Sequence, residues 1–215
     1  MKMVSAAKLR KAQQNVLQMR PYAQKLDEIL VNLSSGLDSN EDNLFAKQRE
    51  VKRMLIVAIT SNSGLCGAFN SNVAKQVINL VKNDYSQLYN TGKVDVVTIG
   101  KKGMEVLKSK GVTTLKNYNT VYEDLTFEKV SAIALEFMNE FISEKYDKVL
   151  FVYNKFRNAA SQDLTVSQFL PIQLEEKAGS STNIDYILEP SKEEIVQELI
   201  PRSLKVKLFS ILLES

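Results

Sequence analysis

Residues 53–60 read Arg-Met-Leu-Ile-Val-Ala-Ile-Thr, a run in which every position between the two ends is apolar. A strand with one face in water would alternate apolar and polar side chains. A continuous run therefore indicates a strand buried on both faces, as in a parallel sheet. A polar loop with two glycines follows at residues 61–67, and residues 69–82 then have apolar side chains at helical spacing. Strand, loop and helix in this order predict a βαβ unit.

The same alternation continues along the chain. Two further apolar runs predict buried strands, and the segments around them predict helices: strands at 94–99 and 148–153, and helices at 104–107 and 127–142. Residues 112–118 and 165–172 predict weaker strands near the sheet edges, the second of them ending at Pro171. Together these elements predict an α/β fold of Rossmann-like type with a doubly wound, mostly parallel sheet.

The first 33 residues differ from the rest, because they contain no glycine and Pro21 is their only helix breaker. Small and apolar side chains recur at alternating steps of three and four, which is typical of a helix that packs along a single partner helix. Pro21 removes one backbone hydrogen bond, so we expect a local bend that does not end the helix. The predicted seam consists of Leu9, Ala12, Val16, Met19, Ala23, Leu26, Leu30 and Leu33.

The chain ends in a second predicted helix. Ser191 is an expected N-cap with Glu194 three residues later, which is the spacing of a capping box. Apolar residues then continue past Pro201 to the final residues. We expect four parts: an N-terminal coiled-coil helix at 1–36, a Rossmann-like globular domain at 50–174, a polar segment at 175–190, and the start of a C-terminal coiled-coil helix at 191–215.

Composition excludes several kinds of site. The chain has no histidine, which rules out histidine-based catalysis and histidine metal ligands. Its single cysteine, Cys66, rules out an intramolecular disulfide and any site built from several cysteines. We expect no metal and no cofactor. No apolar run reaches the length of a membrane span, and the N-terminus lacks the apolar core of a signal peptide.

The net charge is only +3, but the charge is unevenly distributed. The first 26 residues carry basic and no acidic side chains: Lys2, Lys8, Arg10, Lys11, Arg20 and Lys25. A basic helix could bind nucleic acid or an anionic membrane surface. Its seam requires a protein partner first, and Tyr22 is its only aromatic residue, so we expect no nucleic acid.

Two segments are candidates for a phosphate site, because small residues at the start of a helix can cradle an anion. They are the loop from Ser61 to Gly67 and the Gly100-Lys101-Lys102-Gly103 segment. Neither has the spacing of a known nucleotide motif. We favour a structural role, in which glycines permit close packing. The alternative function is a flavin- or nucleotide-binding α/β enzyme that uses the loop.

The remaining reactive side chains are assigned structural roles. Cys66 has no histidine to activate it and is expected to be a buried thiol. Glu140, Glu144 and Asp147 lie around the end of the predicted helix at 127–142. We expect them to belong to its solvated face rather than to act as general acids or bases. No catalytic residue is expected.

Several motifs resemble one known family. Residues 2–13 (KMVSAAKLRKAQ), followed by Arg-Pro-Tyr-Ala at 20–23, resemble the N-terminal helix of ATP synthase gamma subunits. Residues 60–70 (TSNSGLCGAFN) resemble the loop after that family's first strand. Shorter matches at 153–156, 170–171, 189–190 and 212–215 follow in the same order. One departure is Asn62-Ser63, where family members commonly carry Asp-Arg.

The resemblance implies a rotor subunit of a proton-translocating F-type ATP synthase, part of an enzyme complex but without an active site of its own. In that family the terminal helices form an antiparallel coiled coil inside the ring of alpha and beta subunits. The globular domain stands as a foot on the c-ring, beside the epsilon subunit. Rotation of the c-ring is coupled through this shaft to ATP synthesis at the beta subunits. The implied location is peripheral, on the cytoplasmic side of the bacterial inner membrane.

The resemblance also implies roles for single residues. Lys2, Lys8, Arg10 and Lys11 are expected to face acidic loops of the stator. Tyr186 and Glu189 are expected to contact the c-ring or the epsilon subunit. Family members begin earlier and continue beyond Ser215 with a long helix, so this chain resembles a fragment. We therefore expect the unpaired part of helix 1–33 to fray, or to pair with a second copy.

Overall fold

The structure is a computed structural model that describes residues 2–34, 44–158, 161–173 and 192–215. In these residues a five-stranded sheet has the order β3-β2-β1-β4-β5. β1 (Met54–Ile59), β2 (Val94–Ile99), β3 (Lys116–Asn117) and β4 (Lys148–Asn158) are parallel, and β5 (Ser161–Leu170) is antiparallel to β4. The predicted fold class is confirmed, including the continuous burial of β1.

Three strands differ in length from their predictions, and one of them is β5, which runs from Ser161 to Leu170 instead of 165–172. The strand expected at 112–118 is reduced to the two residues of β3, because a 3-10 helix (Asn119–Tyr122) follows at once. β4 extends five residues past the predicted end at Tyr153. This extension is mostly polar because it leaves the sheet core and pairs only with β5, from Asn154–Leu164 to Asn158–Ser161, with a register shift between Phe156 and Asn158.

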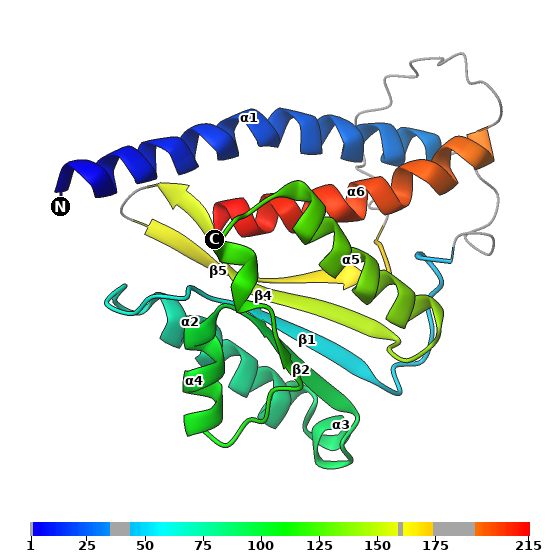
Figure 1. Cartoon of the computed structure of the whole chain (residues 1–215). Coiled ribbons are helices and arrows are strands. Elements are labelled where there is room, and N and C mark those ends of the chain that lie inside the picture. The colour runs from blue at the N-terminus through cyan, green and yellow to red at the C-terminus, as the bar shows by residue number, and fades with distance from the viewer. Residues whose placement is uncertain (1, 35–43, 159–160, 174–191) are drawn as a thin grey trace.

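Helices cover both faces of the sheet (Figure 1). One face carries α2 (Phe69–Asn79), a π-helical turn (Leu80–Asp84), α3 (Ser86–Asn90) and α4 (Lys101–Ser109). The other carries α5 (Phe127–Ile142), whose bounds match the prediction, and α6 (Lys192–Glu214). The alternating side chains of β1 divide between two cores: Met54, Ile56 and Ala58 face α2, whereas Leu55, Val57 and Ile59 face α5 and α6.

The longest helix, α1 (Lys2–Ser34), packs on α6 on the side away from the sheet (Figure 1). The two helices are antiparallel, since the N-terminus of α1 lies at the same end of the molecule as the C-terminus of α6. α6 therefore has two buried sides. Leu204, Leu208 and Ile211 join the core with α5, and Val206 is buried outside that core. This double burial explains why apolar residues occur all around α6.

Candidate functional site

α1 packs against α6, and four of the eight predicted seam residues are buried or half-buried on α1. Val16 and Leu26 are buried, and Met19 and Ala23 are half-buried. They are spaced by three and four residues, so they form one stripe along α1. Ala12 is exposed. The side chains of the other three predicted seam residues, Leu9, Leu30 and Leu33, lie outside the described ones.

An arginine one turn from Val16, the first buried residue of this stripe, bonds to the end of α6. Arg20 Nε donates to Glu214 Oε1 at 2.9 Å, and Arg20 Nη2 donates to the carbonyl oxygen of Phe156 at 3.1 Å. Glu214 is the last residue of α6. Ala12 lies eight residues before Arg20, about 12 Å further along α1 at 1.5 Å per residue. Ala12 is exposed because α6 no longer runs beside it, and α1 continues as a projecting segment, residues 2–15, that we call the overhang.

The overhang is basic where it is described. Arg10 and Lys11 are exposed. The side chains of Lys2 and Lys8 lie outside the described ones. Two large apolar side chains further along α1 are also in water, since Leu17 is 65% exposed and Tyr22 is 43% exposed. A helix with exposed cations and exposed apolar groups has the surface composition of a protein contact.

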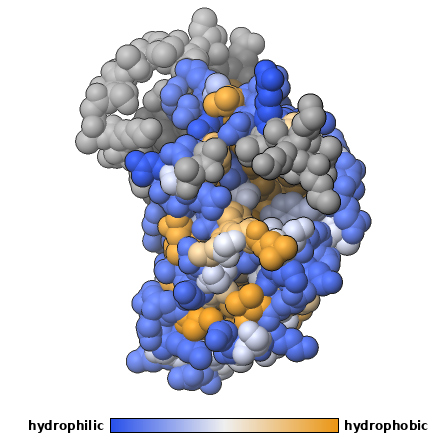
Figure 2. All heavy atoms as spheres, turned by 90° about the vertical axis from the view of Figure 1, so that its left-hand side faces the viewer, coloured by the Kyte–Doolittle hydropathy of each residue, from blue (hydrophilic) through white to orange (hydrophobic). Residues whose placement is uncertain are grey.

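The loop at residues 61–67 lies at the same end of the molecule as the overhang (Figure 1). Leu65 is fully exposed and has a left-handed backbone, with φ of 59°. Cys66 is exposed as well. The prediction of a buried thiol was therefore wrong. The loop turns Cys66 outward because Asn70 occupies the inner side, where it is buried. Figure 2 views the molecule from this end and shows apolar side chains gathered near the middle of the face, surrounded by hydrophilic ones.

The polar groups of this loop bond within the protein. The amide oxygen of Asn70 accepts from Ser61 N at 3.0 Å, and its amide nitrogen donates to the Ser63 carbonyl at 3.2 Å. Asn62 donates to the Asn119 carbonyl and accepts from Lys101 N. Asn154, in the β4 extension, donates to the Phe69 carbonyl at 2.9 Å. The asparagine side chains around this loop are thus engaged within the protein, which favours the structural role of the loop.

The Gly100–Gly103 segment packs closely against Thr60, so its glycines also have a structural role. Gly100 has φ of +105°, and a Cβ atom there would stand 2.0 Å from the Thr60 carbonyl oxygen. α4 begins directly after it at Lys101. The backbone here is too close to Thr60 to leave room for a side chain at Gly100 or at Gly103. Packing therefore explains both glycines, and no bound ligand is needed to account for them.

The three acidic candidates behave differently from one another. Asp147 is buried, not solvated as predicted: its Oδ2 accepts from the backbone nitrogens of Lys52 and Arg53, each at 2.9 Å, and its Oδ1 lies 3.2 Å from Arg49 Nε. The prediction failed because α5 ends before Asp147, which instead anchors the segment leading into β1. Glu144 pairs with Arg49 and is exposed, and Glu140 pairs with Lys145.

The described residues were compared with the requirements of a membrane span and of a metal site. Within the described residues, no helix is long and apolar enough to cross a membrane. The same residues contain no group of three or more acidic or cysteine side chains placed to hold a metal ion.

The chain is similar to known proteins over its whole length. The family model for ATP synthase matches residues 1–215. The ATP synthase gamma chain of Cytophaga hutchinsonii is 47% identical over 218 residues, covering 100% of this chain and 74% of the relative. That of Christiangramia forsetii is 51% identical over 215 residues, covering 100% and 73%. Among solved structures, a chain of the Tetrahymena thermophila mitochondrial ATP synthase central stalk and c-ring has a TM-score of 0.68 at 23% identity. The match covers 100% of this chain and 90% of that chain.

Proposed function

This chain belongs to the family of ATP synthase gamma chains, and we infer that it is the central-stalk rotor subunit of a proton-translocating F-type ATP synthase. It couples rotation of the c-ring to ATP synthesis at the beta subunits and does not itself catalyse the reaction. The observation that carries this role is the course of α1. This helix packs on α6 and then projects past Glu214 from one end of the domain.

The packing of α6 supports the transmission of torque. Leu204, Leu208 and Ile211 are buried against the sheet and α5, while the opposite side of α6 holds α1. A close-packed interior deforms little and transmits strain. A turn of the globular domain would therefore turn α6 and α1 with it, as a shaft attached to its foot.

The overhang is the part that we propose to face the stator. Lys2, Lys8, Arg10 and Lys11 would face acidic loops of the alpha and beta subunits. Charge on a rotating surface attracts over several ångströms without fixed interlocking contacts, so it would hold the helix near the ring while allowing it to slide. The exposure of Arg10 and Lys11 supports this assignment.

The opposite end of the molecule would meet the membrane sector. We propose that Tyr186 and Glu189, which lie outside the described residues, contact the c-ring or the epsilon subunit. The protein would then be peripheral to the bacterial inner membrane, on its cytoplasmic side. The solved structure that contains the Tetrahymena neighbour is of a central stalk with a c-ring, which is consistent with the proposed contact to the membrane sector.

Binding to a gamma-free assembly of bacterial alpha and beta subunits tests the proposal. The chain is expected to co-elute with that assembly, and the complex should weaken with rising salt because exposed charges are screened. Replacing Lys2, Lys8, Arg10 and Lys11 together by glutamine should weaken binding and flatten its salt dependence. The control replaces four exposed lysines of the α2–α4 side, Lys82, Lys93, Lys108 and Lys110. Absence of co-elution by the unaltered chain would overturn the proposed role.

A further inference from the structure

A proline interrupts the hydrogen bonding of α1 about one turn before the overhang begins, and between the two only Val16 is buried. Pro21 lies inside the helix. Proline has no backbone N–H, so the Leu17 carbonyl loses its usual helical donor, and the proline ring opposes a straight helix at this turn. Residues before Pro21 could therefore leave the domain in more than one direction, unless side-chain contacts hold them.

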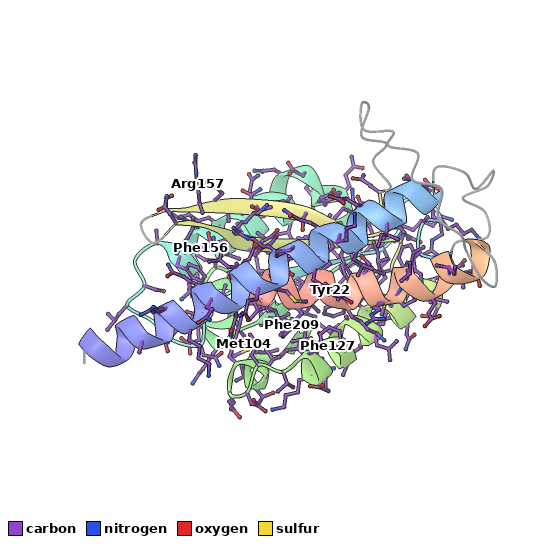
Figure 3. The ribbon with its side chains drawn as sticks, turned by 90° about the horizontal axis from the view of Figure 1, so that it is seen from above. Tyr22, Met104, Phe127, Phe156, Arg157 and Phe209 are labelled. Carbon is purple, nitrogen blue, oxygen red and sulfur yellow. The ribbon has the colours of Figure 1, made fainter. Side chains whose placement is uncertain are left out.

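Arg20 supplies such contacts at the residue next to the proline. Its guanidinium donates to two acceptors on different elements, the Glu214 carboxylate of α6 and the Phe156 carbonyl of β4. Figure 3 shows Phe156 and Arg157 at the end of the β4–β5 hairpin, beside α1. One side chain thus joins α1 to the last residue of α6 and to the sheet.

The surroundings favour an ordered pair over a loose surface contact. The Glu214 side chain is 12% exposed and that of Arg20 is 36% exposed. Glu214 lies close enough to Tyr153 that its charge, after burial, helps to raise the pKa of the tyrosine. A planar guanidinium presents its N–H groups in fixed directions, so it can bond two acceptors at once, whereas a lysine ammonium acts as a single compact charge.

We propose that Arg20 is a positioning residue that holds α1 at the Pro21 turn and thereby sets the direction in which the overhang leaves the domain. The effect of Arg20 on the direction of the overhang follows from the contacts above, whereas its effect on coupling rests on the proposed rotor function. If the overhang is the segment that meets the stator, its direction decides how a rotation of the domain is delivered to the ring. Removal of Arg20 would leave the domain folded, because both hydrophobic cores are formed without this side chain.

The direction of the overhang can be measured in the isolated chain. Spin labels at Gln14→Cys on α1 and Lys108→Cys on α4, in a Cys66→Ser background, report the distance between overhang and domain. We expect a narrow distance distribution with Arg20 and a broad one with Arg20→Ala. Arg20→Lys should give an intermediate width, because lysine keeps the positive charge but lacks the planar guanidinium that bonds two acceptors. Amide exchange of residues 16–19, next to Arg20, should rise about tenfold in Arg20→Ala, since that is the order of one charge-assisted hydrogen bond.

Matched variants separate positioning from general loss of structure. Arg157→Ala removes an arginine next to Phe156 on the β4–β5 hairpin, which lies 3.9 Å from Asp163 with both side chains exposed. It should leave the distance distribution narrow. The charge reversal Arg20→Glu should broaden the distribution, and the double variant Arg20→Glu with Glu214→Arg should narrow it again. An unchanged distribution in Arg20→Ala, or no rescue in the double variant, would overturn the proposal.

The consequence is measured in an ATP synthase assembled with this gamma chain. Arg20→Ala should lower the protons pumped per ATP hydrolysed, while Arg157→Ala should not. A changed distance distribution with unchanged pumping per ATP would reject the link between Arg20 and coupling. Failure of the unaltered chain to assemble would instead concern the proposed function, because the distance measurement does not depend on assembly.

Discussion

Gly103 donates its backbone N–H to Thr60 Oγ1 at 2.9 Å, and a Cβ atom at Gly103 would stand 2.6 Å from that same oxygen. The start of α4 is therefore pressed against the end of β1 with no space for a methyl group. The contact explains the Gly-Lys-Lys-Gly segment by packing, and its hydrogen bond is buried, in addition to the bonds from Lys101 N to Asn62 and from Lys102 N to Ser61.

We expect Gly103→Ala to destabilise the fold by about 1–3 kcal/mol, the range typical of overpacking in a core. The atoms that this Cβ would meet belong to the Thr60 side chain, which is buried and whose Oγ1 lies 3.4 Å from the carbonyl oxygens of Ile99 and Gly100, so it has little freedom to move away. Denaturant unfolding measures the effect. Gly64→Ala is the matched control, since its Cβ would meet only Lys102 Cε at 3.7 Å and should change stability little. Equal stability of the two variants would contradict the packing argument.

Asp147 should be the most costly acidic residue to neutralise among those discussed. Asp147→Asn removes the charge beside Arg49 and leaves Lys52 N and Arg53 N sharing one uncharged acceptor. Breaking a buried ion pair from one side costs about 3–5 kcal/mol, so a loss of roughly that size is expected in the free energy of unfolding. Asp163→Asn, at an exposed pair with 3.9 Å between the charges, should cost less than about 0.5 kcal/mol.

Stability should fall at high pH because of buried tyrosines. Burial, followed by a hydrogen bond to Asp95, raises the pKa of Tyr146 above its usual value near 10. In the unfolded chain this phenol ionises near pH 10, while the folded chain keeps its proton. The stability that Tyr146 contributes is thus complete below pH 10 and is lost as pH rises above it.

Tyr146→Phe should therefore reduce the slope of the unfolding free energy against pH in the range above 10. Tyr22→Phe, on the exposed surface of α1, provides the control. Chemical unfolding at a series of alkaline pH values gives both slopes. The same slope in Tyr146→Phe and in the unaltered chain would show that the phenol is not protected by folding.

Cys66 should react with a thiol reagent in the native state. Its side chain is exposed in the loop, and the sequence contains no other cysteine. One equivalent should be labelled at a rate close to that of the unfolded chain, and Cys66→Ser should abolish the signal. Labelling only after denaturation would mean that the thiol is covered in solution.

The overhang should be the least protected part of α1. An isolated helix of its length is marginal in water, and α6 does not run beside residues 2–15 to stabilise it. Amide exchange of residues 2–15 should be faster than that of residues 16–29, or the chain should form a dimer in which a second copy supplies the contact. A strictly monomeric chain with uniform protection along α1 would contradict both outcomes.

Local patterns alone predicted much of this fold. The apolar runs at 53–60 and 94–99 became β1 and β2, because a strand that is apolar on both faces is stable only inside a sheet with two covered faces. The periodicity at 127–142 predicted α5, and the spacing of three and four residues agrees with the burial of Val16 and Leu26 on α1, although Ala12 of the same pattern is exposed. These features depend on residues close together in sequence.

Tertiary structure decided the features that depend on distant partners. Arg20 and Glu214 are 194 residues apart, and no local pattern in either helix indicates that they meet. Asp147 is buried because Arg49 and two backbone N–H groups compensate its charge, and Cys66 is exposed because Asn70 fills the inside of its loop. Burial of a polar group depends on the partners that the fold brings to it, whereas periodicity records only the neighbours along one element.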